Sequence, residues 1–105
     1  MDTKGHPGYT SFFSEYGDVA PGLEVDHLKI FREEKAKRGI LMIAHHSSIW
    51  DTRVCEQHPE WCVIQKDGTP DPNIMEPNSG YVDQKLIPQL KELAGKYGFD
   101  GVWLD

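Results

Sequence analysis

Apolar residues recur every three positions between Val25 and Phe31, and charged residues surround and follow them. Val25, Leu28 and Phe31 form one apolar stripe, and the segment after them is rich in Lys, Arg and Glu. This period predicts a helix with a solvated charged face, and Gly39 is the residue type expected directly after its end. Residues 1–20 contain Gly, Pro, Ser and Tyr without a sustained period, which predicts a loop.

Two short apolar runs predict strands that are buried on both faces, as in a parallel sheet. The first covers residues 40–44, and the second covers residues 101–104. The segment 52–77 between them is rich in Pro and Gly, and it predicts a long connection with one helical turn near residues 52–57.

A second helix is predicted by an apolar stripe with helical spacing along Val82–Tyr97. Asn78 or Ser79 can cap its beginning, and Gly98 closes it. Pro88 removes one backbone donor from the middle of this helix, so we expect an irregularity there.

The order helix, strand, long loop, helix, strand is typical of a parallel α/β fold with about two βα units. No crossover helix follows the last predicted strand, so we expect residues 1–105 to form one incomplete domain cut from a larger barrel or sheet. Open strand edges predict exposed apolar surface and self-association of the isolated chain.

The charge balance excludes some partners. The 105 residues contain 11 Lys and Arg against 17 Asp and Glu, for a net charge of −6. Because no basic cluster is present, we expect neither a nucleic acid nor an anionic membrane surface as a partner. The longest apolar run, residues 40–44, is far shorter than a membrane span, and the first residues lack the apolar stretch of a signal peptide.

Cys55 and Cys62 are the two cysteines, seven positions apart. They are compatible with two ordinary thiols, with a local disulfide, or with a zinc site that also uses His58. No common zinc spacing is present, so we expect neither a metal nor another cofactor.

Several motifs occur in an order that resembles a known enzyme family. They are the early Lys-Gly-His-Pro-Gly-Tyr (4–9), the helix end Arg-Gly before an apolar strand, the His-Pro-Glu-Trp loop (58–61), and the final Asp-Gly-Val-Trp-Leu-Asp (100–105). In this order they resemble the N-terminal half of glycoside hydrolase TIM barrels. The similarity is greatest to hypothetical glycosyl hydrolases of the β-galactosidase-associated type, and more distant to retaining α-L-fucosidases.

The resemblance implies roles for particular residues. In fucosidases the early loop reads Lys-His-His-Asp-Gly-Phe, and its histidines bind sugar hydroxyls. Here Lys4, His6, Gly8 and the aromatic Tyr9 match this loop, whereas Gly5 and Pro7 depart from it. The aspartate that closes the Trp-containing strand is the catalytic nucleophile of that family. Asp105 occupies this position.

General barrel geometry indicates the same region. Groups at the carboxyl ends of barrel strands converge on one opening, so His6, one of His45 and His46, Asn78 and Asp105 could line one cleft. His45 and His46 are consecutive in an extended segment, so at most one of them faces it.

Aromatic rings suit sugar recognition, because a flat apolar ring matches the C–H face of a pyranose. Trp50 and Trp61 are candidates for this role, and we expect Trp61 either to contact a substrate or to pack in its loop. Trp103 lies inside a predicted strand, so we expect it in the core.

We therefore expect part of a partial (β/α)8 barrel whose full-length protein hydrolyses O-glycosidic bonds of a carbohydrate substrate with retention. Retention needs a second carboxylate, which Glu60 or Glu76 could supply but which we expect beyond residue 105.

Two alternatives remain. One is a non-catalytic carbohydrate-binding module. The other is a metal-dependent hydrolase that uses His6, a His45 or His46 nitrogen, Asp51 and Asp105 as ligands.

Overall fold

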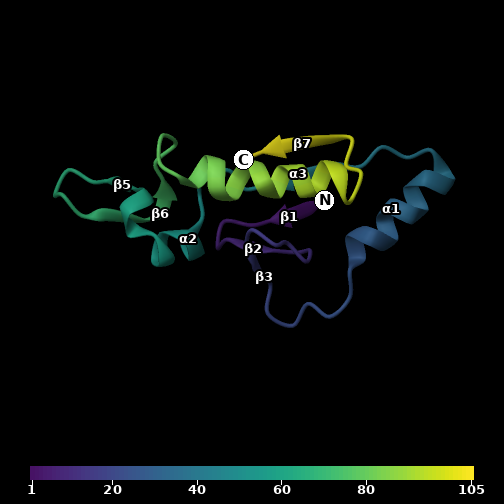
Figure 1. Cartoon of the computed structure of the whole chain (residues 1–105), viewed down its shortest axis with the longest axis horizontal. Coiled ribbons are helices and arrows are strands. Elements are labelled where there is room, and N and C mark those ends of the chain that lie inside the picture. Colours follow the sequence, from purple (N-terminus) through teal and green to yellow (C-terminus); the bar gives the residue numbers. More distant parts are fainter.

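The computed structural model describes residues 1–105 as a mixed α/β fold around a mostly parallel five-stranded sheet (Figure 1). The strand order is β3-β2-β1-β4-β7, with bounds β1 Asp2–Lys4, β2 Tyr9–Thr10, β3 Asp18–Val19, β4 Ile43–His46 and β7 Gly101–Leu104. β1, β4 and β7 run parallel, and only the β1–β2 pair is antiparallel. This confirms the predicted parallel α/β class.

Two predictions about the strands were wrong. Residues 1–20 contain β1, β2 and β3, which were missed because strands of two or three residues are too short to show alternation. The strand predicted at 40–44 begins three residues later and includes both histidines, because the apolar pair Ile40 and Leu41 lies outside the sheet in the connection from the preceding helix.

The first helix, α1 (His27–Arg38), has the predicted end. Asp26 caps its beginning by accepting a hydrogen bond from the Lys29 backbone N–H, and Gly39 ends it with a left-handed φ of 64°. Its apolar stripe is only partly covered, because Leu28 is buried whereas Val25 and Phe31 remain about half exposed. α1 accordingly extends away from the sheet (Figure 1).

The predicted long connection contains a small subdomain. The helical turn was located correctly as α2 (Thr52–Gln57), but a 3-10 turn (Pro59–Trp61) and a hairpin of β5 (Cys62–Ile64) and β6 (Pro70–Met75) follow it. β6 also supports the loop after β4, because the Asp51 N–H donates to the Asn73 carbonyl and the Met75 N–H to the Ile49 carbonyl.

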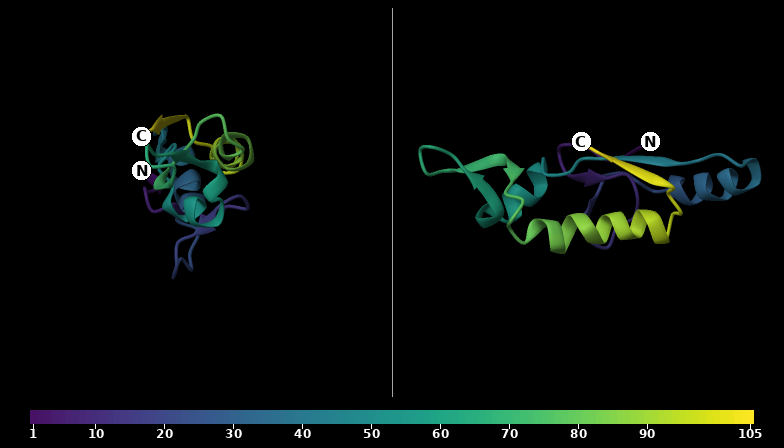
Figure 2. Two further views of the ribbon diagram at one scale, coloured as in Figure 1. Left: turned by 90° about the vertical axis from the view of Figure 1, so that its left-hand side faces the viewer. Right: turned by 90° about the horizontal axis from the view of Figure 1, so that it is seen from above.

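The second helix runs alongside β7 (Figure 2) and shows the expected irregularity. A π-helical turn, Val82–Leu86, leads directly into α3 (Ile87–Gly95), where Pro88 lies in the first turn. Before the π-helical turn the Ser79 hydroxyl accepts a hydrogen bond from the Tyr81 N–H, but the turn itself has no side-chain cap, so the predicted capping role of Asn78 or Ser79 was wrong. The missing N–H of Pro88 accounts for the altered hydrogen-bond pattern before it.

Two small apolar clusters replace one central core. The first lies under the small subdomain: Val54, Cys55, Cys62, Met75, Tyr81 and Leu86. The second lies between the sheet and its helices: Phe12, Leu28, Ala44, Leu93 and Tyr97. Leu90 packs against both, so α3 joins the two parts of the molecule.

The sheet edge at β7 is open. Val102, Trp103 and Leu104 are all exposed, Trp103 by 69%. The expectation that this strand is buried and that Trp103 lies in the core was therefore wrong, because β7 is the edge strand and no further strand or helix of the chain covers its outer side. The molecule is correspondingly elongated, with extents of 54 × 26 × 17 Å.

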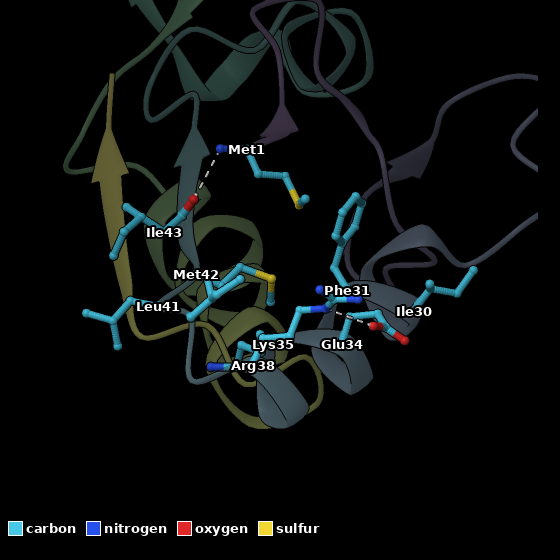
Figure 3. A pocket seen from close by; sticks show the side chains of 10 residues that line it. Met1, Ile30, Phe31, Glu34, Lys35, Arg38, Leu41, Met42 and Ile43 are labelled. Atoms are coloured by element: carbon cyan, nitrogen blue, oxygen red, sulfur yellow. Dashed lines mark hydrogen bonds and ion pairs between the residues drawn. The ribbon is translucent and has the colours of Figure 1, made fainter.

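A second uncovered apolar region lies at the amino end of β4. A cavity of about 520 Å³ opens between α1 and the strand and is lined by Phe31, Leu41 and Ile43 among others (Figure 3). No helix in the structure is both long and apolar enough to cross a membrane.

Candidate functional site

Polar side chains gather at the carboxyl ends of β1, β4 and β7. They surround a cavity of about 150 Å³ lined by Asp2, Lys4, Gly5, His6, His45, Ser47 and Asp105. Parallel pairing produces this arrangement, because β4 and β7 align Ile43 with Gly101 and His46 with Leu104, and both strands end at the same edge. The cavity lies at the opposite end of β4 from the apolar cavity of Figure 3.

Asp105 follows directly after β7, and its backbone is fixed. Its carbonyl accepts hydrogen bonds from the Ser48 N–H and Oγ, both at 2.8 Å, and its N–H donates to the His46 carbonyl. Its side chain is half exposed, with Oδ2 at 3.2 Å from His45 Nε2 and 3.8 Å from His6 Nε2. The sheet thus presents one carboxylate to two imidazoles.

His45 lies between two carboxylates. Its Nδ1 is 2.6 Å from Asp2 Oδ1, and its Nε2 faces Asp105. The hydrogen bond with Asp2, with a smaller contribution from Asp105, raises the pKa of His45 above 6.5. The same bond lowers the pKa of Asp2. His45 therefore favours its charged form at the cavity.

His6 follows β1 and has a defined tautomer. Its Nδ1 is 3.0 Å from Ser47 Oγ, and this hydroxyl already donates to the Trp50 carbonyl at 2.8 Å. The His6 Nδ1–H must therefore donate to Ser47, which leaves Nε2 of the neutral ring as an acceptor toward the cavity. The ring also stacks on Trp50, with centroids 4.8 Å apart and planes inclined by 22°.

His46 points to the other face of the sheet. It is fully buried between Thr3 Oγ1, at 2.9 Å, and Gln89 Oε1, at 2.9 Å. Burial lowers the pKa of His46 to about 4, so it is neutral at pH 7. The expectation that only one of the two adjacent histidines faces the cleft is confirmed.

The Lys4 ammonium lies behind the cavity in a buried ion pair. Its Nζ is 3.1 Å from Asp51 Oδ2 and 2.5 Å from the Tyr81 hydroxyl, and neither charged side chain is more than 1% exposed. Burial lowers the pKa of Lys4. These contacts join β1 to the loop after β4 and to the second helix, and so they support the cavity from behind.

Three predicted sugar-binding residues lie away from the cavity. Tyr9 packs against the Arg53 guanidinium, 5.5 Å from the ring centroid. Trp61 stacks on His58 with centroids 3.9 Å apart, and Asn78 donates to the Glu76 carboxylate. The structure brings His6, His45 and Asp105 together at the cavity. Tyr9, Trp61 and Asn78 lie elsewhere.

Glu60 and Glu76, the two acids considered for proton transfer, do not line the cavity either. Glu60 bonds to His58, and Glu76 accepts from Asn78. Asp2 is the second carboxylate at the cavity, but it contacts the opposite side of the His45 ring from Asp105.

The ligand set proposed for a metal-dependent hydrolase is not assembled. Asp51 is turned toward Lys4 and Tyr81, and no cluster of three or more His, Cys, Asp or Glu side chains is arranged to hold a metal ion. Cys55 and Cys62 are free, buried thiols, and burial raises the pKa of Cys55. This arrangement corresponds to two ordinary thiols rather than to a disulfide or a zinc site.

Asp2 and Ser47 are the site residues that the sequence reasoning missed. Asp2 was missed because β1 was read as loop, and only the pairing of β1 with β4 brings it to His45. Ser47 stands directly after two histidines in the sequence, and this position at a strand end was the available signal.

A mostly parallel α/β sheet with a polar site at its strand ends is the class defined by the fold and the site. Among solved structures, the chain is similar to α-L-fucosidase isoenzyme 2 from Paenibacillus thiaminolyticus, with 25% identity and a TM-score of 0.82. The match covers 99% of this chain and 17% of the fucosidase chain. No family model matches the sequence, and a search of curated proteins finds no match.

Proposed function

We propose that the chain is part of a glycoside hydrolase catalytic barrel whose full-length protein hydrolyses O-glycosidic bonds with retention. The observation that carries this proposal is the Asp105 carboxylate, which lies at the carboxyl end of a parallel strand beside His6 and His45. Similarity to an α-L-fucosidase over nearly the whole chain supports it. In this proposal the residues form an incomplete (β/α)8 barrel that further strands complete.

Asp105 is the proposed nucleophile. A retaining enzyme uses one carboxylate to attack the anomeric carbon, and a second group about 5–5.5 Å away protonates the leaving oxygen and later activates water. Asp2 is unsuited to the second role because the His45 ring lies between it and Asp105. We therefore assign the acid/base to a part of the barrel outside residues 1–105.

Sugar recognition is assigned to His6 and Trp50. The His6 Nε2 can accept a hydrogen bond from a sugar hydroxyl, and the half-exposed Trp50 ring offers an apolar face beside it. Gly5 and Pro7 replace a histidine and an acid of the fucosidase motif, so a different sugar from L-fucose fits the proposal equally well.

Nucleophile trapping tests the proposal in the full-length protein that contains these residues. The probes are 2-deoxy-2-fluoroglycosyl fluorides, with the L-fucosyl derivative included, because a fluoride leaving group needs no acid catalyst. We expect a covalent adduct on the peptide that contains Asp105, detected by mass spectrometry, and no adduct after Asp105→Asn. Labelling at a different carboxylate would contradict the assignment.

A carbohydrate-binding module without catalysis is the second candidate. It is favoured by one observation: His6, which lines the cavity, stacks on the Trp50 ring, whereas no second carboxylate lies on the same side of His45 as Asp105. Binding measurements on the full-length protein separate the two. If the protein binds sugar but no glycoside is hydrolysed, and Asp105→Asn changes neither result, the binding module replaces the hydrolase.

A further inference from the structure

Strand register brings three charged side chains into one row across the sheet. β1 and β4 pair Asp2 with His45, and β4 and β7 pair His45 with Trp103. Asp105 lies two residues beyond Trp103, and its backbone carbonyl bonds to Ser48 in the loop after β4. The imidazole of His45 therefore lies between the carboxylates of Asp2 and Asp105.

The geometry of this row fixes the protonation of the ring. An ionised carboxylate only accepts hydrogen bonds, so each ring nitrogen that faces one must carry a hydrogen. His45 Nδ1 faces Asp2 at 2.6 Å and Nε2 faces Asp105 at 3.2 Å, so both contacts form only when the ring is an imidazolium. We propose that His45 is a positioning residue for Asp105, held by Asp2 through one nitrogen and fixing the Asp105 carboxylate through the other.

Neighbouring residues restrict the positions that Asp105 and the His45 ring can adopt. Ser48 already holds the Asp105 backbone, so the remaining freedom is that of the side chain, which His45 restricts. The Trp103 ring meets the His45 ring edge-on at 5.8 Å and limits its rotation. Ser48 and His45 thus restrict Asp105 directly, and Asp2 and Trp103 restrict the His45 ring.

Other charged groups around the ring do not replace these contacts. His6 Nε2 is 3.8 Å from Asp105, beyond ordinary hydrogen-bond distance, and the amino terminus donates to the Ile43 carbonyl. Behind the sheet, Lys4 faces Asp51, and His46 is buried between Thr3 and Gln89. Within the row, Asp2 provides the stronger contact and raises the pKa of His45 most.

The consequence for catalysis rests on the proposed function. A nucleophile must be aligned with the anomeric carbon, and a carboxylate free to rotate loses part of its rate advantage. If Asp105 is this nucleophile, His45 aligns it only at a pH where the His45 ring is charged. Deprotonation would leave one of the two carboxylates without its donor.

The test is a titration of the isotopically labelled full-length protein by NMR, which does not depend on enzymatic activity. It follows the ring carbons of His45 and the side-chain carboxyl carbon of Asp105. We expect the His45 midpoint to lie above 6.5, and the Asp105 signal to show an inflection at that same pH. Asp2→Asn should lower the His45 midpoint toward 6.5 and move the Asp105 inflection with it.

The controls separate coupling from general structural change. His45→Gln should abolish the Asp105 inflection, whereas the ring signals of exposed His27, on α1, should be the same in all variants and provide an internal reference. The inference would be overturned if the Asp105 signal shows no inflection at the His45 midpoint, or if the His45 midpoint lies at or below 6.5. If His45→Gln does not fold, the Asp2→Asn comparison gives the same decision.

Activity of the full-length protein provides the complementary readout. We expect His45→Gln to lower kcat more than tenfold with KM little changed, and to remove the pH limb that follows the His45 midpoint. Adduct formation on Asp105 without NMR coupling would overturn the inference and leave the proposed function supported. NMR coupling with normal turnover in Asp105→Asn would overturn the proposed function and leave the positioning contact supported.

Discussion

His45 and His46 are neighbours in the sequence, yet they respond to pH in opposite directions. Folding favours the charged form of His45, so its contribution to stability is present below pH 6.5 and is lost as the pH rises through its raised pKa. Folding favours the neutral form of His46, so its contribution is present above pH 6.5 and is lost as the pH falls toward 4. Side-chain alternation in β4 creates this difference.

The first prediction concerns His46. Between pH 6.5 and about 4, His46 is protonated in the unfolded chain but stays neutral in the folded chain. The free energy of unfolding should therefore fall as the pH is lowered. This residue contributes about 3 kcal/mol at most to that fall. Urea unfolding at several pH values measures it, and His46→Gln should flatten the curve in this range. An unchanged slope would contradict the neutral, buried assignment.

The second prediction concerns the Lys4–Asp51 pair. Lys4→Met leaves the Asp51 carboxylate buried without its partner, because both side chains are at most 1% exposed. We expect the free energy of unfolding to fall by about 3–5 kcal/mol. Exposed Lys66 is the matched control, and Lys66→Met should change stability by less than about 0.5 kcal/mol. Equal effects in the two variants would rule out a special role for the buried pair.

At the scale of elements, helix ends were the most predictable features. The end of α1 at Gly39, the turn at Thr52–Gln57 and the irregularity at Pro88 all follow from local backbone chemistry. The short strands β1 to β3 and the hairpin of β5 and β6 were missed. β1 to β3 have only two or three residues each, too few to show alternation, and β6 contains two prolines, which indicate a turn rather than a strand.

The third prediction compares two glycines. Gly39 has a φ of 64°, so Gly39→Ala should lower stability by about 1 kcal/mol although no atom lies in the way of the added methyl group. Gly95 lies in α3 with a helical backbone and open space, so Gly95→Ala should raise stability by about 0.5–1 kcal/mol. Thermal unfolding of both variants measures the difference, and shifts of the same sign would contradict the explanation from backbone conformation.

At the scale of the whole molecule, uncovered apolar surface is the dominant feature. Fifteen large apolar or aromatic side chains are exposed, including the row along β7 and the lining of the cavity in Figure 3. Surface of this kind is typical of an interaction face. It agrees with the sequence-based expectation of exposed apolar surface, whereas the expected self-association is still a prediction.

The fourth prediction is that the isolated chain self-associates through this surface. Leu41 is 75% exposed beside the apolar cavity, so Leu41→Lys should shift the population toward monomer in sedimentation velocity experiments. Ile64, 60% exposed on the separate hairpin, is the control, and Ile64→Lys should have a smaller effect. A wild-type chain that sediments as a single monomeric species would contradict the prediction.

The sequence by itself determined the α/β class, the helix ends, the strand before Asp105 and the separation of His45 from His46 onto two faces. Each depends on periodicity, capping or backbone geometry within a few residues. Only the tertiary structure decided that Lys4 is buried against Asp51, that Tyr9, Trp61 and Asn78 lie away from the cavity, and that Asp2 joins His45. The contacts of Lys4 with Asp51 and of Asp2 with His45 join segments more than 40 residues apart and depend on strand register, which local patterns do not encode.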